Sequence, residues 1–207
     1  MNNIKASVDF LIELDQLKSI YRKAKIKCDH NRQENSAEHS WHVAIASQIL
    51  KDFTAIEIDI NKVTQMLLIH DIVEIYAGDM FSFENERSKE SHKLEEYKAI
   101  EKLCTQFNLT QVKIYKDLWH EFEACTTNEA KFARSVDRIL PFIQNMNNKG
   151  GSWAEFGTTK QQILNHNKIS KEVSSELWEY INNQLDFAVN KGWIIDEKIS
   201  LVAENEI

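Results

Sequence analysis

Residues 66–77, MLLIHDIVEIYA, form an apolar run that three ionisable side chains interrupt. Apolar residues on every side are typical of a helix that is buried all round. At roughly 100° per residue, His70, Asp71 and Glu74 project into one sector of such a helix. Burying imidazole and carboxylate groups without partners is costly. The run therefore predicts a central buried helix whose ionisable groups are gathered by a ligand, and a divalent cation is the simplest candidate.

Tight turns are few in this chain, because it has only five glycines and one proline among 207 residues. This scarcity favours long helices over a β-sandwich or barrel. The length suits one domain with a substantial core. We therefore predict an all-α, single-domain, multi-helix fold. Its core spans about residues 10–145, and C-terminal helices at about 159–191 pack on that core.

The spacing of apolar residues predicts where each helix lies. The predicted helices cover residues 4–24, 37–54, Asp59 or Asn61 to Ala77, 88–107, 110–125, 128–147, 159–166 and 170–191. Residues 25–35 and 78–87 are predicted loops, and 148–152 resemble a linker. The expected N-caps are Asn35 or Ser36 for the second helix, Asp59 or Asn61 for the central helix and Thr127–Asn128 for the helix at 128–147. Gly78 should end the central helix, Pro141 should kink its own helix, and Trp41, Ile49 and Phe53 should be buried.

Charge and cysteine content exclude several classes of protein. The net charge is −7 and there is no basic cluster, so neither nucleic acid nor an anionic membrane is an expected partner. The three cysteines are scattered and form no C-x-x-C pair, which argues against a disulfide framework or a thiolate zinc site. No segment resembles a signal peptide or a membrane span. We expect a cytoplasmic protein.

Metal-type ligands also occur outside the central run, at His39 and at Asp137. His39 alone would most simply be a core histidine, and Asp137 alone a partner of Arg134 or Arg138. Together with His70 and Asp71 they would provide two nitrogen and two oxygen ligands. Such a set suits Mn²⁺, Co²⁺, Fe²⁺, Zn²⁺ or Ni²⁺ better than Ca²⁺, and Mg²⁺ is a further possibility.

This pattern resembles the HD-domain superfamily of metal-dependent phosphohydrolases, and in particular its 5′-deoxynucleotidase-like group. The matching blocks are NSAEHS at 35–40, HDxxE at 70–74, Gly78–Asp79, KFARSVDR at 131–138 and SWxxFG at 152–157. The resemblance covers about residues 10–193. One departure is that residues 17–22 lack the Arg-Trp pair by which deoxynucleotidases of this group select the sugar.

The resemblance implies one divalent metal ion held by four ligands, His39, His70, Asp71 and Asp137. It also implies an all-helical homodimer that removes phosphate from nucleoside 5′-monophosphates, and it makes Glu74 and Asp79 the catalytic carboxylates that do not bind the metal. Which of these two is base and which is acid stays open.

The substrate phosphate needs further cations or donors, and two residues are candidates. Arg32 lies in the polar segment before His39 and can bind phosphate bidentately, and a solvated surface arginine is the equal alternative. His42 can donate to the phosphate, support His39 or simply line the groove. Lys18 and Arg22, at the end of the predicted first helix, are weaker candidates.

Three alternatives remain open. The first is an HD-type hydrolase of another phosphate ester or of a phosphodiester, and the second is a non-catalytic helical module that binds a metal. A two-metal carboxylate bundle would need Glu-x-x-His on two helices, which the sequence lacks. We therefore rank that third alternative low.

Overall fold

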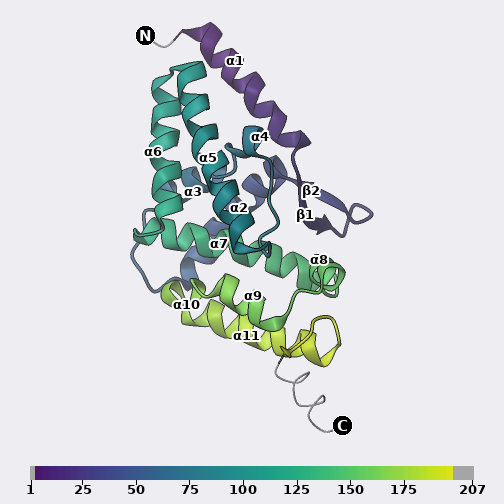
Figure 1. Cartoon of the computed structure of the whole chain (residues 1–207). Coiled ribbons are helices and arrows are strands. Elements are labelled where there is room, and N and C mark those ends of the chain that lie inside the picture. Colours follow the sequence, from purple (N-terminus) through teal and green to yellow (C-terminus); the bar gives the residue numbers. More distant parts are fainter. Residues whose placement is uncertain (1–2, 198–207) are drawn as a thin grey trace.

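The computed structural model describes residues 3–197, and its helices pack in two tiers on either side of one long helix, α7 (Asn128–Asn147). In Figure 1, α7 crosses the middle of the molecule. The tier that holds the metal-type residues contains α2 (Ser36–Leu50), α3 (Ile60–Ile69), α4 (Glu74–Ala77), α5 (Glu86–Phe107) and α6 (Thr110–Ala124). The other tier contains α8 (Gly151–Phe156), α9 (Lys160–Asn167), α10 (Ser170–Val173) and α11 (Ser175–Asn190). The all-α prediction is confirmed, apart from one small hairpin.

Each tier has its own hydrophobic core, and α7 contributes to both. Ala133 and Val136 face the first core, together with side chains of α2, α3, α5 and α6. Ile139 and Phe142 face the second core, against α8, α9 and α11. Each fully buried large apolar side chain contributes about 1.5–3 kcal/mol. Because α7 is packed on both sides, the residues between its two buried faces are held in fixed positions.

Side-chain caps fix where the helices of the first tier begin. Asn35 and Glu38 form a reciprocal capping box at the start of α2, Asp59 caps α3, and the Thr127 hydroxyl accepts from the Ala130 N–H at 3.2 Å in α7. The caps at Asn35, Asp59 and Thr127 match the sequence predictions. Helix α7 continues through Pro141 to Asn147.

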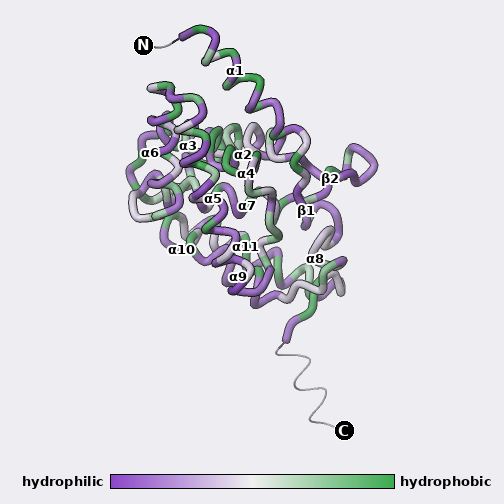
Figure 2. The backbone as a smooth tube through the Cα atoms, turned by 45° about the horizontal axis from the view of Figure 1, so that its top comes forward, coloured by the Kyte–Doolittle hydropathy of each residue, from purple (hydrophilic) through white to green (hydrophobic). Residues whose placement is uncertain are grey.

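The first predicted helix is too long. Helix α1 covers Ile4–Leu14, a short 3₁₀ helix covers Asp15–Ser19, and the chain then forms an antiparallel hairpin of β1 (Tyr21–Ile26) and β2 (Arg32–Asn35). The predicted loop at 25–35 is therefore partly strand. The hairpin lacks an apolar alternation because most of its side chains are polar, as its mainly purple colour in Figure 2 shows. Its turn contains His30 and Asn31, both at positive φ.

The central helix is not continuous as predicted. Helix α3 ends at Ile69, residues 70–73 form turns, and α4 begins at Glu74. Within this segment the backbone forms bonds to the third preceding residue, such as Glu74 N–H to Asp71 O at 3.0 Å. Apolar spacing cannot distinguish this tighter winding from an α-helix. Gly78 ends α4 with φ 77°, a positive angle that few other residues adopt easily.

Two further predictions are corrected by the structure. Helix α8 occupies residues that we assigned partly to a linker. Trp41, Ile49 and Phe53, predicted to be buried, are 62%, 63% and 47% exposed. They lie on the outer side of α2 and of the 3₁₀ turn Lys51–Phe53 that follows it. Within residues 3–197, no helix combines the length and apolar character needed to cross a bilayer.

Candidate metal centre and active site

Three side chains from three different helices meet in the interior of the first tier. His39 comes from α2, His70 follows the last residue of α3, and Asp137 comes from α7. The Asp137 Oδ1 atom lies 3.0 Å from His39 Nε2 and 3.5 Å from His70 Nε2. One potential ligand atom from each residue lies within 4.8 Å of the others. This spacing allows one ion to contact all three.

The hydrogen bond of the His70 imidazole leaves its other nitrogen directed at this point. The His70 Nδ1–H donates to the Leu67 carbonyl at 2.8 Å, which leaves Nε2 with a lone pair. That Nε2 is buried and has no hydrogen-bond partner among residues 3–197. An unpartnered buried nitrogen beside a carboxylate oxygen fits a metal ligand, so the residues present fit a divalent cation.

Asp71 lies beside this group. Its Oδ1 is 3.1 Å from His70 Nε2, and its Oδ2 accepts from the Arg22 guanidinium at 3.0 Å. The structure thus brings together all four residues predicted as metal ligands. His39, His70 and Asp137 form the tightest set, and Asp71 contacts it through His70. The ligand roles themselves remain predictions.

The electrostatics of the centre favour an ionised Asp137. Burial alone would raise the pKa of this carboxyl, but the imidazoles of His39 and His70 hold its pKa well below the usual range. The pKa of Glu74 moves the other way, because burial and the nearby Asp71 carboxylate raise it well above normal. Burial also raises the pKa of Asp79. The Asp137 carboxylate can therefore bind a cation in its ionised form, whereas Glu74 and Asp79 can hold a proton more readily.

Glu74 and Asp79 both lie at the edge of the centre, around the guanidinium of Arg22. The Arg22 Nη1 atom is 3.0 Å from Asp71, 3.5 Å from Asp79 and 3.9 Å from Glu74. The Ser36 hydroxyl donates to Glu74 Oε2. Neither Glu74 nor Asp79 belongs to the cluster of His39, His70 and Asp137, whose potential ligand atoms lie within 4.8 Å of one another.

Arg22 and Glu34 also belong to the site. The sequence predicts only a weak phosphate-binding role for Arg22, and it places Glu34 in a loop with no site role. Glu34 is 2% exposed, and its Oε2 lies 3.3 Å from His39 Nδ1 and 3.7 Å from Arg22 Nε. The Gln144 amide of α7 donates to Glu34 Oε1 at 2.7 Å. The polar hairpin thus supplies the ionic surroundings of the centre.

The two predicted substrate-binding residues lie away from this cluster. Arg32 is exposed on the hairpin, where its guanidinium pairs with Asp29 and with Glu38. His42 packs beside Trp41 on α2, with ring centroids 5.8 Å apart, in a groove next to the hairpin. Their roles in binding remain predictions.

A cavity of about 170 Å³ lies against the centre. Asp79 and Asp137 form part of its wall, and Arg22 and Arg138 bring positive charge to it. Its aromatic lining consists of Phe81, Phe83, Phe142, Trp153 and His166. The cavity combines carboxylates, guanidinium groups and aromatic rings. This combination suits a charged molecule that also has a flat apolar part.

Comparison with known proteins agrees with this geometry. The human 5′-deoxynucleotidase HDDC2 is 25% identical over 175 residues, which cover 82% of this chain and 84% of the human protein. The Xenopus laevis protein of the same name is 24% identical over 97% of this chain and 92% of its own length. A crystal structure of a predicted metal-dependent phosphohydrolase from Magnetospirillum magnetotacticum is 35% identical, with a TM-score of 0.85 over 92% of this chain and 95% of that protein.

The family model described as HD domain matches residues 14–178, a region that contains every residue of the centre described above. The fold of this chain, its histidine–aspartate cluster and the proteins similar to it all agree with the resemblance seen in the sequence. The chain belongs to the HD-domain family.

Proposed function

We propose that this HD-domain protein is a metal-dependent phosphomonoesterase that releases phosphate from nucleoside 5′-monophosphates. The observation that carries the proposal is the convergence of His39, His70 and Asp137 next to two carboxylates outside the ligand set, at the wall of a cavity. The names of the relatives, 5′-deoxynucleotidase and metal-dependent phosphohydrolase, support the same reaction.

The residues of the site have separate tasks in this proposal. His39, His70, Asp71 and Asp137 would hold one divalent cation, which supplies Lewis acidity toward the phosphoryl group and the attacking water. Glu74, oriented by the Ser36 hydroxyl, exchanges a proton with the water or with the leaving oxygen, and Asp79 takes the other role. Arg22 holds the carboxylates in place by pairing with Asp71 and by lying close to the other two.

A panel of substrates tests the proposal. Purified protein is loaded with Mn²⁺ or Co²⁺, and phosphate release is measured with deoxyribonucleoside and ribonucleoside 5′-monophosphates. Phosphodiesters and phosphate esters without a base are included in the same panel. We expect release from the nucleoside monophosphates and loss of that release after chelation. Turnover of only the other esters would favour an HD-type hydrolase of different substrate class, and a metal-loaded protein without turnover would favour a non-catalytic module.

Several finer points belong to the same proposal. The imidazole and carboxylate donors favour Mn²⁺, Co²⁺, Fe²⁺, Zn²⁺ or Ni²⁺, with Mg²⁺ as a further candidate.

A cytoplasmic location is supported by the three cysteines, which are free in the structure. A homodimer is supported by apolar side chains that remain exposed on α2. Arg32 and His42, which lie away from the metal centre, remain proposed substrate-binding residues.

The carboxylate of Glu34 gives a separate prediction. It lies behind His39, on the side opposite to Asp137, and can fix the imidazole with Nε2 toward the metal. Mutation of a group that hydrogen-bonds a metal-ligating histidine weakens metal affinity by about 10–100-fold. We expect Glu34→Gln to weaken Mn²⁺ binding by that factor in a calorimetric titration. Glu38→Gln is the matched control, because Glu38 lies in the same segment but bonds Arg32 and the Asn35 N–H. Equal affinities in the two variants would contradict the prediction.

A further inference from the structure

Most of the inward-facing arginines of this chain have a carboxylate partner. Arg22 pairs with Asp71, and Arg134 pairs with Glu123 at 2.7 Å while its guanidinium lies 3.9 Å above the Phe122 ring. Arg138 differs from them. Within the described part of the chain no carboxylate forms an ion pair with it, and its one hydrogen bond goes from Nη1 to the His166 carbonyl at 2.7 Å.

The surroundings of Arg138 make its positive charge unfavourable. The side chain is partly buried, and Arg134 lies one helical turn before it on α7. Like charges at this spacing repel each other on a helix. A partly buried guanidinium that forms no ion pair with a carboxylate of the described residues is favourably placed to bind an incoming anion.

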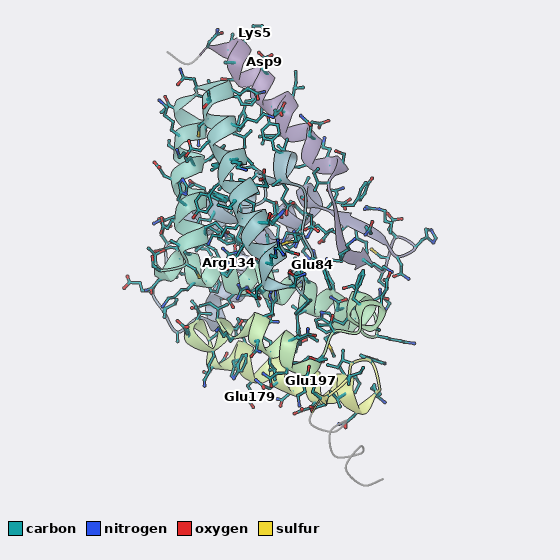
Figure 3. All side chains as sticks on the ribbon, in the orientation of Figure 1. Lys5, Asp9, Glu84, Arg134, Glu179 and Glu197 are labelled. Atoms are coloured by element: carbon teal, nitrogen blue, oxygen red, sulfur yellow. The ribbon has the colours of Figure 1, made fainter. Side chains whose placement is uncertain are left out.

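The position of Arg138 indicates where that anion would bind. Arg138 directly follows Asp137, and the two residues line the same cavity together with Asp79. It also lines the neighbouring hollow that contains Glu74 and His92. Arg134, one helical turn before Arg138 on α7, is labelled near the middle of the view in Figure 3. An anion bound by Arg138 in this cavity would lie beside the predicted metal ligand Asp137.

We propose that Arg138 is the phosphate-binding arginine of this site, and that it takes the dianionic phosphate of a monoester. This inference rests on the proposed function and adds to it the residue that orients the group to be transferred. The planar guanidinium matches two phosphate oxygens at once. Because Nη1 already donates to His166, the other donors remain for the substrate.

A purely structural role for Arg138 must be separated from this one. His166 lies in the last turn of α9, so the bond from Arg138 also joins α7 to the carbonyl end of that helix. Loss of this bond would lower the stability of the protein without any effect on phosphate. The experiment therefore has to measure phosphate binding and unfolding separately.

The test compares Arg138→Gln, Arg138→Lys and the control Arg87→Gln, which removes the same charge from an exposed position on α5. Binding of inorganic phosphate is measured by calorimetry on metal-free and Mn²⁺-loaded protein, and KM and kcat are measured with a nucleoside monophosphate. Hydrogen bonds to charged groups correspond to about 10–100-fold in affinity. We expect Arg138→Gln to weaken phosphate binding and raise KM by that factor. Arg138→Lys should lie between it and the wild type, and Arg87→Gln should match the wild type.

The outcomes separate this inference from the proposed function. Phosphate affinity unchanged in Arg138→Gln, or in Arg138→Lys if the glutamine variant fails to fold, would overturn the role of Arg138 even if the wild type is active. A wild type that turns over no monophosphate, yet binds phosphate through Arg138, would overturn the proposed function alone. Weaker phosphate binding at an unchanged unfolding temperature and unchanged Mn²⁺ content would support the role of Arg138 directly.

Discussion

Asp137→Ala is expected to abolish both metal binding and phosphate release. Its Oδ1 atom lies between the Nε2 atoms of His39 and His70, so one carboxylate serves both imidazoles. Without it, the two rings face each other at 5.4 Å between centroids with no negative charge from α7 to balance a cation. Metal content after dialysis against Mn²⁺, together with phosphate release from nucleoside monophosphates, measures the effect.

The same variant should also lower the stability of the metal-free protein. His39 is fully buried, and the substitution removes the Oδ1 atom that lies within hydrogen-bond distance of its Nε2. Leaving a buried polar group without a partner costs about 1–3 kcal/mol. Urea unfolding in the presence of a chelator measures this loss of unfolding free energy. Asp117→Ala, which removes an exposed carboxylate from α6, should change neither metal content nor the unfolding free energy by a comparable amount. Normal Mn²⁺ content in Asp137→Ala would contradict the proposed ligand role.

The helices of this protein could be predicted from the sequence because burial imposes a clear apolar period on them. Helices α5, α6 and α7 begin and end close to their predicted positions. The hairpin could not be predicted in the same way. Its strands contain mainly polar residues, and Arg22 and Glu34 are held by contacts with carboxylates and an imidazole from distant helices. Tertiary ion pairs of this kind leave no local pattern.

The centre itself was easier to predict than its surroundings. His39, His70, Asp71 and Asp137 lie together as the sequence resemblance implied, because each is an unusual group in a largely apolar helical context. The break between α3 and α4 was missed because 3₁₀-type and α-type turns place apolar residues at nearly the same spacing. The ion pairs of Arg32 could not be foreseen either, since they depend on the hairpin.

Glu74→Gln should separate proton transfer from metal binding. The side chain keeps its size and can still accept from the Ser36 hydroxyl, but it no longer exchanges a proton. General acid–base catalysis contributes about 10²–10⁴-fold to a rate. We therefore expect kcat to fall by a factor in that range, while Mn²⁺ affinity stays close to that of the wild type because Glu74 is not one of the four predicted ligands. Stopped assays of phosphate release measure kcat, and a calorimetric titration measures the Mn²⁺ affinity.

Glu96→Gln is the matched control for this variant. Glu96 is also shielded from solvent, and burial followed by the charge of Glu123 raises its pKa to about 7. It lines the hollow next to Glu74, but among the described residues its ion pair is with His92 and not with Arg22 or the predicted ligands. If loss of any carboxylate in this region slows turnover equally, the effect is one of general electrostatics and Glu74 has no special role. If Glu74→Gln instead loses its metal, Glu74 is a ligand, and the proton must move through Asp79.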